Sequence, residues 1–88
     1  MKTVVFYENP NASMEKFMEV YPRHKAVEDE FVKSGKVLGI GAFSIQGDGA
    51  MAIYIDRETA EDFVAQDPFA SEGLYAKVTL KEWNDEIK

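Results

Sequence analysis

The sequence has 88 residues, of which 45% are hydrophobic and 30% are charged. These fractions are typical of a globular protein and differ from those of disordered chains. Ten basic and sixteen acidic residues give a net charge of −6, which repels a phosphate backbone and argues against nucleic acid as a partner. Cysteine is absent, which excludes disulfides, thiolate nucleophiles and thiolate metal ligands.

The apolar segments are all short. The N-terminal apolar run, residues 3–7, is too short for a signal peptide, and no segment approaches the roughly 20 apolar residues of a membrane span. We therefore expect a cytoplasmic protein with no membrane partner. No linker or repeat interrupts the chain, so we expect residues 1–88 to form a single domain.

The first half of the chain predicts a strand and then a helical region. Residues 3–7 are β-branched and aromatic, and turn residues follow them. From Ser13 onward, apolar residues recur at helical spacing, at Phe17, Val20, Val27 and Phe31. Pro22 interrupts this region, and proline inside a helix removes a hydrogen bond. We therefore expect a kink or a fresh start there, with a short helical turn over 14–19 and the main helix over 22–34.

The second half predicts two strands, a helix and a last strand. Residues 37–45 and 50–55 are expected to pair as antiparallel neighbours, because an Asp-Gly pair between them favours a hairpin. A helix over Arg57–Gln66 follows, with Asp56 as its N-cap. In the final run, Tyr75–Trp83, apolar and polar residues alternate, which predicts a strand.

The resulting order, β-α-β-β-α-β, predicts an α+β protein with the ferredoxin-like fold. In this fold two helices cover one face of a four-stranded antiparallel sheet and leave the other face open. In the strands over 3–7 and 50–55, apolar residues occupy both odd and even positions. Both faces of the sheet are therefore apolar and need to be covered. An exposed apolar sheet face marks an association surface. We therefore expect a homodimer that forms through the open sheet face.

Several short motifs occur in order along the chain: Arg23-His24-Lys25, the run from Ser34 to Gly41, Asp67-Pro68-Phe69 and Gly73-Leu74-Tyr75. Together they resemble the YciI-like (YCII-related) family. The resemblance implies a dimeric α+β barrel built on the ferredoxin-like fold. The wider group of such barrels includes muconolactone isomerases, and several of its members act on small organic molecules. The resemblance also implies a catalytic histidine and aspartate, which correspond here to His24 and Asp67. One relative removes chloride from a chlorinated hydroxyquinol. The connection before residue 50 is shorter than in longer relatives, which leaves any specificity carried by this loop open.

His24 is the only histidine, and it falls on the apolar stripe of the predicted helix, so it should point inward. Two interpretations remain open: a core histidine bonded to a backbone carbonyl, or a general base. In the first turn after Pro22, the helix dipole would favour the neutral imidazole. Asp67 would then fix the tautomer. Asp67 could equally cap a short helix that has Pro68 at its first position and runs through Phe69 to Ser71. Both roles could coexist, with one carboxylate oxygen for each.

Other residues are candidates for substrate binding, each with a structural alternative. Tyr7, Tyr54 and Ser44 are strand hydroxyls that could line a cavity or serve only as sheet residues. Gly41 and Gly39 are expected on one face of the strand with Val37. They could form the bottom of a cavity or allow close packing of the backbone. Arg23 could anchor an anionic group of a substrate.

The remaining residues of note have simpler interpretations. Met14, Met18 and Trp83 are expected to fill the core or an interface. Glu28, Asp29 and Glu30 are expected on a solvated helix face rather than in a metal cluster. Gly39 and Gly41 lie inside a predicted strand, so no phosphate-binding loop is predicted, and we expect no cofactor and no metal.

Two functions of different classes remain. The first is an enzyme of lyase or isomerase type, in which His24 acts as general base and acid on a small cyclic or phenolic compound and Asp67 orients it. The alternative is a non-catalytic dimeric domain that binds a small ligand, in which His24 only forms a hydrogen bond to that ligand. A closed space around His24 would favour the core histidine, and an open cleft would favour either function.

Overall fold

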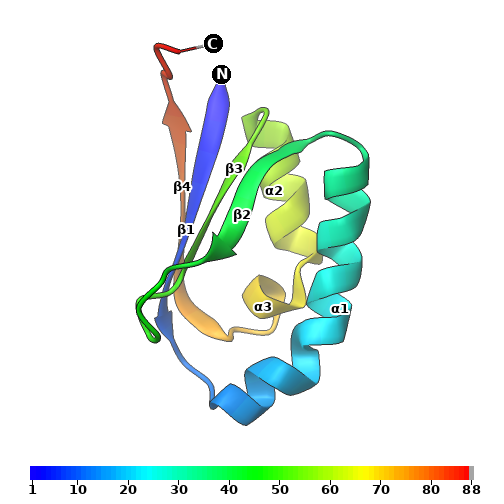
Figure 1. The fold of residues 1–88 in the computed structure, drawn as a ribbon, viewed down its shortest axis with the longest axis vertical. Helices are drawn as coiled ribbons and strands as arrows, with labels where there is room; N and C mark the ends of the chain where they lie inside the picture. Colours follow the sequence, from blue (N-terminus) through cyan, green and yellow to red (C-terminus); the bar gives the residue numbers. More distant parts are fainter. Residues whose placement is uncertain (88) are drawn as a thin grey trace.

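The structure, a computed structural model, describes residues 1–87. Four strands form one antiparallel sheet in the order β2-β3-β1-β4, and three helices cover one of its faces (Figure 1). The strands are β1 (Lys2–Pro10), β2 (Val37–Ala42), β3 (Ala50–Tyr54) and β4 (Tyr75–Trp83), and the helices are α1 (Met14–Lys33), α2 (Arg57–Gln66) and α3 (Pro68–Ser71). The predicted ferredoxin-like α+β fold is confirmed. Within residues 1–87, no helix has the length and apolar character needed to cross a membrane.

Helix α1 is continuous from Met14 to Lys33 although Pro22 lies inside it. The prediction of two separate helices is therefore wrong, whereas the predicted kink is visible as a bend between the first turns of α1 and the rest (Figure 1). Pro22 has no N–H for the preceding turn, and its ring crowds that turn, which is the usual cause of such a bend. The bend carries the first turns beneath the space between sheet and helices, where Val20 is fully buried.

The connection between β2 and β3 is longer than predicted, because β2 ends at Ala42 rather than at residue 45. Residues 43–49 form a loop that the Phe43 N–H closes by donating to the Gly49 carbonyl at 2.9 Å. Gly49 has a φ of 98°, and a Cβ on it would lie 2.0 Å from the carbonyl oxygen of Tyr7. Only glycine therefore allows the loop to close against β1.

A register shift between Val37 and Gly39 divides β2 into two parts that face differently. Val37 packs against the core, whereas Gly39 and Gly41 pair with Ile53 and Met51, which belong to the open face of the sheet. The prediction that Val37 shares a face with these glycines is wrong, because the bulge adds a residue and reverses the alternation. A Cβ at Gly39 or at Gly41 would meet nothing within 4 Å, so neither glycine is required by close packing.

The core lies between the sheet and the helices. Its buried members come from β1, β3, α1 and α2: Val5, Tyr7, Ala52, Tyr54, Phe31, Ala60 and Phe63. On the opposite face, β1 and β3 present Val4 and Phe6 beside Ile53 and Met51, as their pairing requires. None of the helices in the described part of the chain covers this face (Figure 1).

Three residues that were expected to fill the core or an interface are exposed. Met14, Met18 and Trp83 are 54%, 69% and 43% accessible. Core filling is therefore wrong for all three, and an interface or ligand role stays open. For the two methionines the reason is the bend at Pro22, which turns the first part of α1 so that only Phe17 and Val20 face inward there.

Candidate active site

His24 and Asp67 are in direct contact. The Nδ1 atom of His24, on α1, lies 2.8 Å from Oδ1 of Asp67, at the junction of α2 and α3. The two side chains are 12% and 1% exposed. His24 reaches this position because the inward stripe of α1 carries it, between the buried residues Val20 and Phe31.

Asp67 holds this contact through a cap. Its Oδ1 accepts a hydrogen bond from the Phe69 N–H at 3.0 Å, and Pro68 takes the first position of α3, where a missing N–H costs nothing. One oxygen therefore serves both the cap and His24, whereas separate oxygens were expected. A carboxylate only accepts hydrogen bonds, so a neutral imidazole carries its proton on Nδ1 and its lone pair on Nε2.

Aromatic rings fix the plane of the imidazole. The Phe69 ring stacks on it with centroids 4.1 Å apart and an angle of 12° between the planes. Phe63 meets it edge-on at 6.4 Å, and Tyr21 lies at 5.9 Å on the other side of the bend. The ring is thus held on its face, at its edge and at Nδ1.

The helix dipole does not act on His24 as expected. Since α1 begins at Met14, His24 lies in the middle of a helix and not in its first turn. The dipole effect fades within one turn of the helix end. The environment of His24 is set by Asp67 and the aromatic rings instead.

A cavity of about 300 Å³ opens beside this pair. It includes four residues that were predicted for the site, His24, Asp67, Tyr7 and Gly41. It also includes residues that were not predicted as site residues, among them Tyr21, Glu28, Phe69 and Tyr75. An open space beside the imidazole supports a ligand-binding role over a filled core position.

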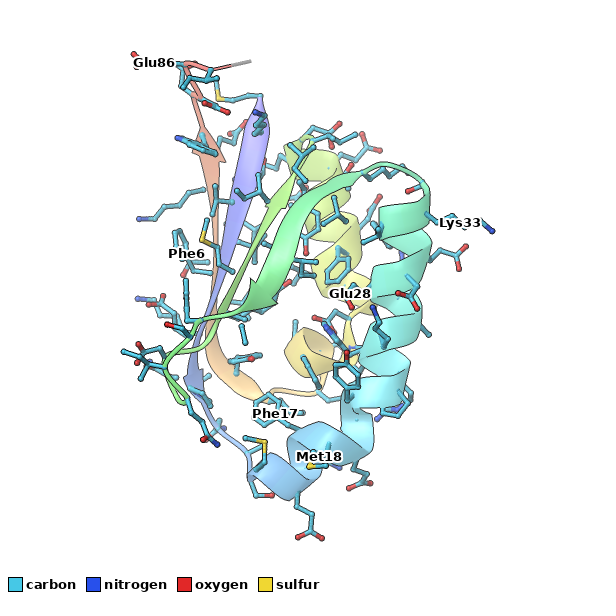
Figure 2. The ribbon with its side chains drawn as sticks, viewed as in Figure 1. Phe6, Phe17, Met18, Glu28, Lys33 and Glu86 are labelled. Carbon is cyan, nitrogen blue, oxygen red and sulfur yellow. The ribbon has the colours of Figure 1, made fainter. Side chains whose placement is uncertain are left out.

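Glu28 is the second carboxylate at this cavity. It lies one helical turn beyond His24, its side chain is 15% exposed, and Figure 2 shows it on the side of α1 that faces the sheet. Lys25 pairs with it at 3.2 Å. The expectation that Glu28 lies on a solvated face is therefore wrong. The spacing of three and four residues from His24 could have identified both Tyr21 and Glu28.

Three tyrosines near the cavity keep their phenolic protons. Burial, together with the charge of Asp67, raises the pKa of Tyr7 and of Tyr75 above the usual value, and burial with the nearby Tyr7 raises that of Tyr54. The hydroxyls of Tyr7 and Tyr54 lie 3.3 Å apart. Tyr54 is fully buried and does not line the cavity, so its contact with the site is the one between its hydroxyl and that of Tyr7.

Arg23 and Ser44 do not join the others. Arg23 follows Pro22 on the outer side of α1 and forms an ion pair with Glu72, so its guanidinium is engaged away from the cavity. Ser44 lies in the exposed loop after β2, because β2 ends at Ala42, two residues before Ser44. The geometry gives neither residue a place beside His24.

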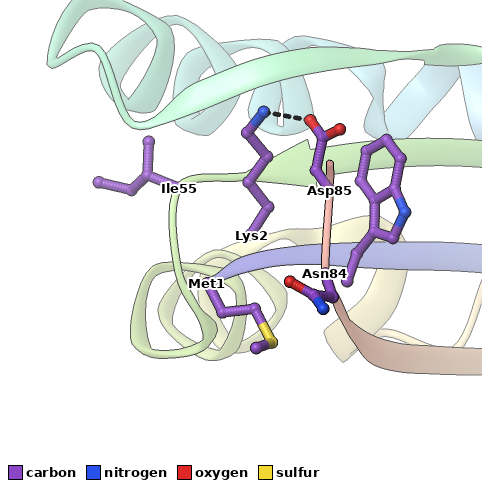
Figure 3. Close-up of a pocket in the computed structure, with 6 residues that line it drawn as sticks. Met1, Lys2, Ile55, Asn84 and Asp85 are labelled. Carbon is purple, nitrogen blue, oxygen red and sulfur yellow. Dashed lines mark hydrogen bonds and ion pairs between the residues drawn. The ribbon is translucent and has the colours of Figure 1, made fainter. Parts of the chain in front are cut away.

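A separate cavity of about 460 Å³ lies near the chain ends, where Lys2 and Asp85 form an ion pair next to Trp83 (Figure 3). None of the residues predicted for the site lines it. Within residues 1–87, no group of three or more His, Asp or Glu side chains is arranged to hold a metal ion. The candidate site is therefore the cavity at His24.

The fold defines a class, the ferredoxin-like α+β proteins. Residues 1–84 match the model of the YCII-related domain, and the chain belongs to this family. A comparison with curated proteins gave no match.

Two solved structures are similar in fold. The first is a 5-chloro-2-hydroxyhydroquinone dehydrochlorinase from Burkholderia phenoliruptrix AC1100 in complex with 2,5-dihydroxybenzoquinone, with a TM-score of 0.70, 20% identity and coverage of 96% of this chain and 94% of that chain. The second is a mutant of SnoaB, a cofactor-independent oxygenase from Streptomyces nogalater, with a TM-score of 0.59, 17% identity and coverage of 98% and 95%. At these identities the similarity establishes the fold.

Proposed function

We propose that this chain is an enzyme of lyase or isomerase type that transfers protons on a small cyclic or phenolic compound, with His24 as general base and acid. The observation that supports this most strongly is the 2.8 Å contact between His24 Nδ1 and Asp67 Oδ1 at the wall of an open cavity. Asp67 takes one ring nitrogen and leaves Nε2 for a ligand. This is the arrangement of a base oriented by a third group.

The proposed step begins when Nε2 accepts a proton from a hydroxyl group or a ring carbon of the ligand. The imidazolium that forms is stabilised by the negative charge of Asp67. In an isomerisation, the same proton returns to a different atom of the ligand. In an elimination, the electron pair expels an anionic leaving group, and the proton leaves His24 for water.

The neutral phenols give the cavity its preference for oxygen-bearing ligands. Tyr7 and Tyr75 line it and keep their protons, because burial raises the pKa of both. Each can donate a hydrogen bond to the oxygen on which negative charge develops. Glu28 provides an acceptor for a ligand hydroxyl across the same space.

The dehydrochlorinase with the same fold acts on a chlorinated hydroxyhydroquinone and was solved with a dihydroxybenzoquinone. At 20% identity it supplies the class of compound to test first and no residue roles. The test incubates the protein with 2-hydroxyhydroquinone in D₂O and follows ring-proton exchange by NMR. Release of chloride from 5-chloro-2-hydroxyhydroquinone is measured in parallel.

Removal of the base in His24→Ala is expected to lower either rate by about 10²- to 10⁴-fold, which is the usual contribution of general acid–base catalysis. Glu30→Gln, an exposed change on the same helix, is the matched control and should keep the wild-type rate. A His24→Ala protein that is folded and as active as Glu30→Gln would overturn the proposal. Binding of these compounds without turnover would favour the non-catalytic, ligand-binding alternative.

We also propose that the protein forms a homodimer through the uncovered face of the sheet. This face carries Val4, Phe6, Met51 and Ile53, and an apolar hollow of about 300 Å³ lies over part of it. Lys81 extends across the ring of Phe6, with its Nζ 6.0 Å from the centroid. An apolar centre with a charged rim is typical of an association surface.

A further inference from the structure

A second hollow adjoins the cavity at His24 and differs from it in character. This hollow, the Met18 groove, has a volume of about 480 Å³ and lies between the first turns of α1 and the loop 43–49. Its walls include Met14, Phe17, Met18, Tyr21, Phe43 and Ile45. Among residues 1–87, no Asp, Glu, Lys, Arg or His lines it.

The walls of the Met18 groove hold much of the apolar surface that this chain exposes. Met18 is 69% exposed, Ile45 is 66% exposed and Met14 is 54% exposed. Exposed apolar residues that gather in a concave place mark a binding site, whereas single ones are ordinary. The methionines offer flexible and polarizable contacts suited to irregular apolar shapes.

The groove and the His24 cavity form one continuous surface. Tyr21, Phe69 and Tyr75 line both. Phe17, in the groove, packs edge-on against Phe69 at 5.2 Å, and Phe69 in turn stacks on His24. Figure 2 shows Phe17 and Met18 on the first turns of α1, where the helix passes below the space between sheet and helices. An aromatic wall therefore runs from the groove to the imidazole.

We propose that the ligand of this chain is amphipathic: a hydroxylated ring occupies the His24 cavity, and an apolar extension of the same molecule lies in the Met18 groove. This inference rests on the proposed function, because it assigns the polar end of the ligand to His24. One end of the continuous surface offers His24, Glu28 and Tyr7, and the other offers only apolar and uncharged contacts. A compound with a single small ring would leave the groove empty.

The geometry favours a small molecule over a second protein chain in this groove. The groove is a hollow that shares lining residues with a cavity that holds paired, buried polar groups. The surface suited to another copy of this chain is the uncovered face of the sheet, on the side away from the helices (Figure 1). The two surfaces therefore take different partners.

The test compares two ligands with the same head, 4-ethylresorcinol and 4-hexylresorcinol, by calorimetry and by NMR. Each methylene that is fully buried strengthens binding about fourfold. The longer ligand has four more methylenes, and the groove is open on one side, so burial of about half of them predicts at least a roughly tenfold tighter complex. The shorter ligand should shift the His24 ring signals, and the longer one should also shift the methyl signals of Met14 and Met18.

The Met18→Glu variant places a charge in the groove and should reduce the ratio of the two affinities to about threefold or less, while the affinity for 4-ethylresorcinol stays unchanged. Val32→Glu, at an exposed apolar position near the other end of α1, is the matched control and should keep the full ratio. Ile45→Glu repeats the test from the loop side if Met18→Glu fails to fold.

Equal affinity of the two resorcinols, with both shifting His24, would overturn the inference and leave the proposed function intact. Binding of 4-hexylresorcinol that shifts the methionine methyls and not His24 would also overturn it, because the groove would then be a separate surface. Failure of both resorcinols to bind at millimolar concentration would overturn it for this class of ligand. The proposed function is judged separately by the exchange and chloride-release assays.

Discussion

At the scale of single residues, Asp67 serves two purposes with one atom. Its Oδ1 caps α3 and accepts the hydrogen bond from His24. The motif Asp-Pro explains why: Pro68 starts the helix, and the residue before it must be extended and free to cap. A local rule of helix capping thus fixes the partner of the imidazole.

Because of this double role, we predict that two substitutions at Asp67 lower the free energy of unfolding by different amounts. Asp67→Asn keeps an oxygen that can cap α3 and should lower the free energy of unfolding by about 1 kcal/mol. Asp67→Ala loses the cap as well as the His24 partner and should cost about 2–3 kcal/mol. Both should lose activity by tenfold or more, since neither can stabilise an imidazolium. Urea unfolding and the exchange assay measure the two effects, and equal stability losses would contradict the double role.

Because two tyrosine side chains are buried, we expect the folded protein to lose stability at alkaline pH. The pKa of Tyr54 and of Tyr7 is raised above the usual value of about 10, chiefly by burial. Below pH 10 both folded and unfolded chains hold these protons. Above it, only the unfolded chain releases them, so the free energy of unfolding falls as pH rises toward the folded pKa.

Each such tyrosine adds a slope of about 1.4 kcal/mol per pH unit above pH 10. The Tyr54→Phe variant should therefore lose stability less steeply than wild type when urea unfolding is compared at pH 9, 10 and 11. An identical slope in the two proteins would show that Tyr54 ionises equally in the folded and unfolded states.

Part of the candidate site could be read from the sequence, and the reason is local geometry. His24 was placed inward by the spacing of Phe17, Val20 and Phe31, and Asp67 by its motif. Tyr75 could not be placed at the cavity in this way, because its position depends on how β4 pairs with β1 after a long separation in sequence. Arg23 was assigned by its charge alone, which does not reveal that Glu72 engages it.

At the scale of elements, the bend in α1 and the loop 43–49 decide the shape of the site. The bend places Phe17 against Phe69, and the loop supplies the facing wall of the Met18 groove. The limits of α2 and β4 could be predicted because caps and alternation are local signals. The end of β2 could not, because it depends on the contact between Gly49, in the loop 43–49, and Tyr7, on β1, which are far apart in the sequence.

Two glycines of this loop allow its closure to be tested. Gly47 and Gly49 both have positive φ, of 95° and 98°, but only a Cβ on Gly49 would collide with the Tyr7 carbonyl. Gly47→Ala should cost about 1–2 kcal/mol of unfolding free energy from backbone strain. Gly49→Ala should cost clearly more or prevent folding, because backbone atoms must move apart. If urea unfolding shows equal losses, the close approach of the loop to β1 is not required for folding.

At the scale of the whole molecule, the sheet has one face that the helices bury and one that no helix or strand among residues 1–87 covers (Figure 1). A chain of this length buries a small core, so burial of the second face adds a large share to stability. The proposed homodimer supplies that burial. It also leaves the His24 cavity, on the helical side, open to ligands.

Phe6→Glu places a charge at the centre of the uncovered face and should convert the dimer into a monomer, because an unpaired charge is costly to bury between two sheets. Light scattering at micromolar concentration measures the mass. Val32→Glu, on the outer side of α1, is the control and should remain dimeric. A wild-type protein that is monomeric and stable at this concentration would contradict the sheet-to-sheet dimer.

The proposed orientation of His24 by Asp67, with Nε2 facing a ligand, is tested most directly by ¹⁵N NMR of the imidazole. The protein has one histidine, so its ring signals need no assignment. In the neutral ring, we predict a proton on Nδ1 and none on Nε2, and a change in the Nε2 signal when 2,5-dihydroxybenzoquinone is added. A neutral ring with its proton on Nε2, or an Nε2 signal that saturating ligand leaves unchanged, would contradict the account.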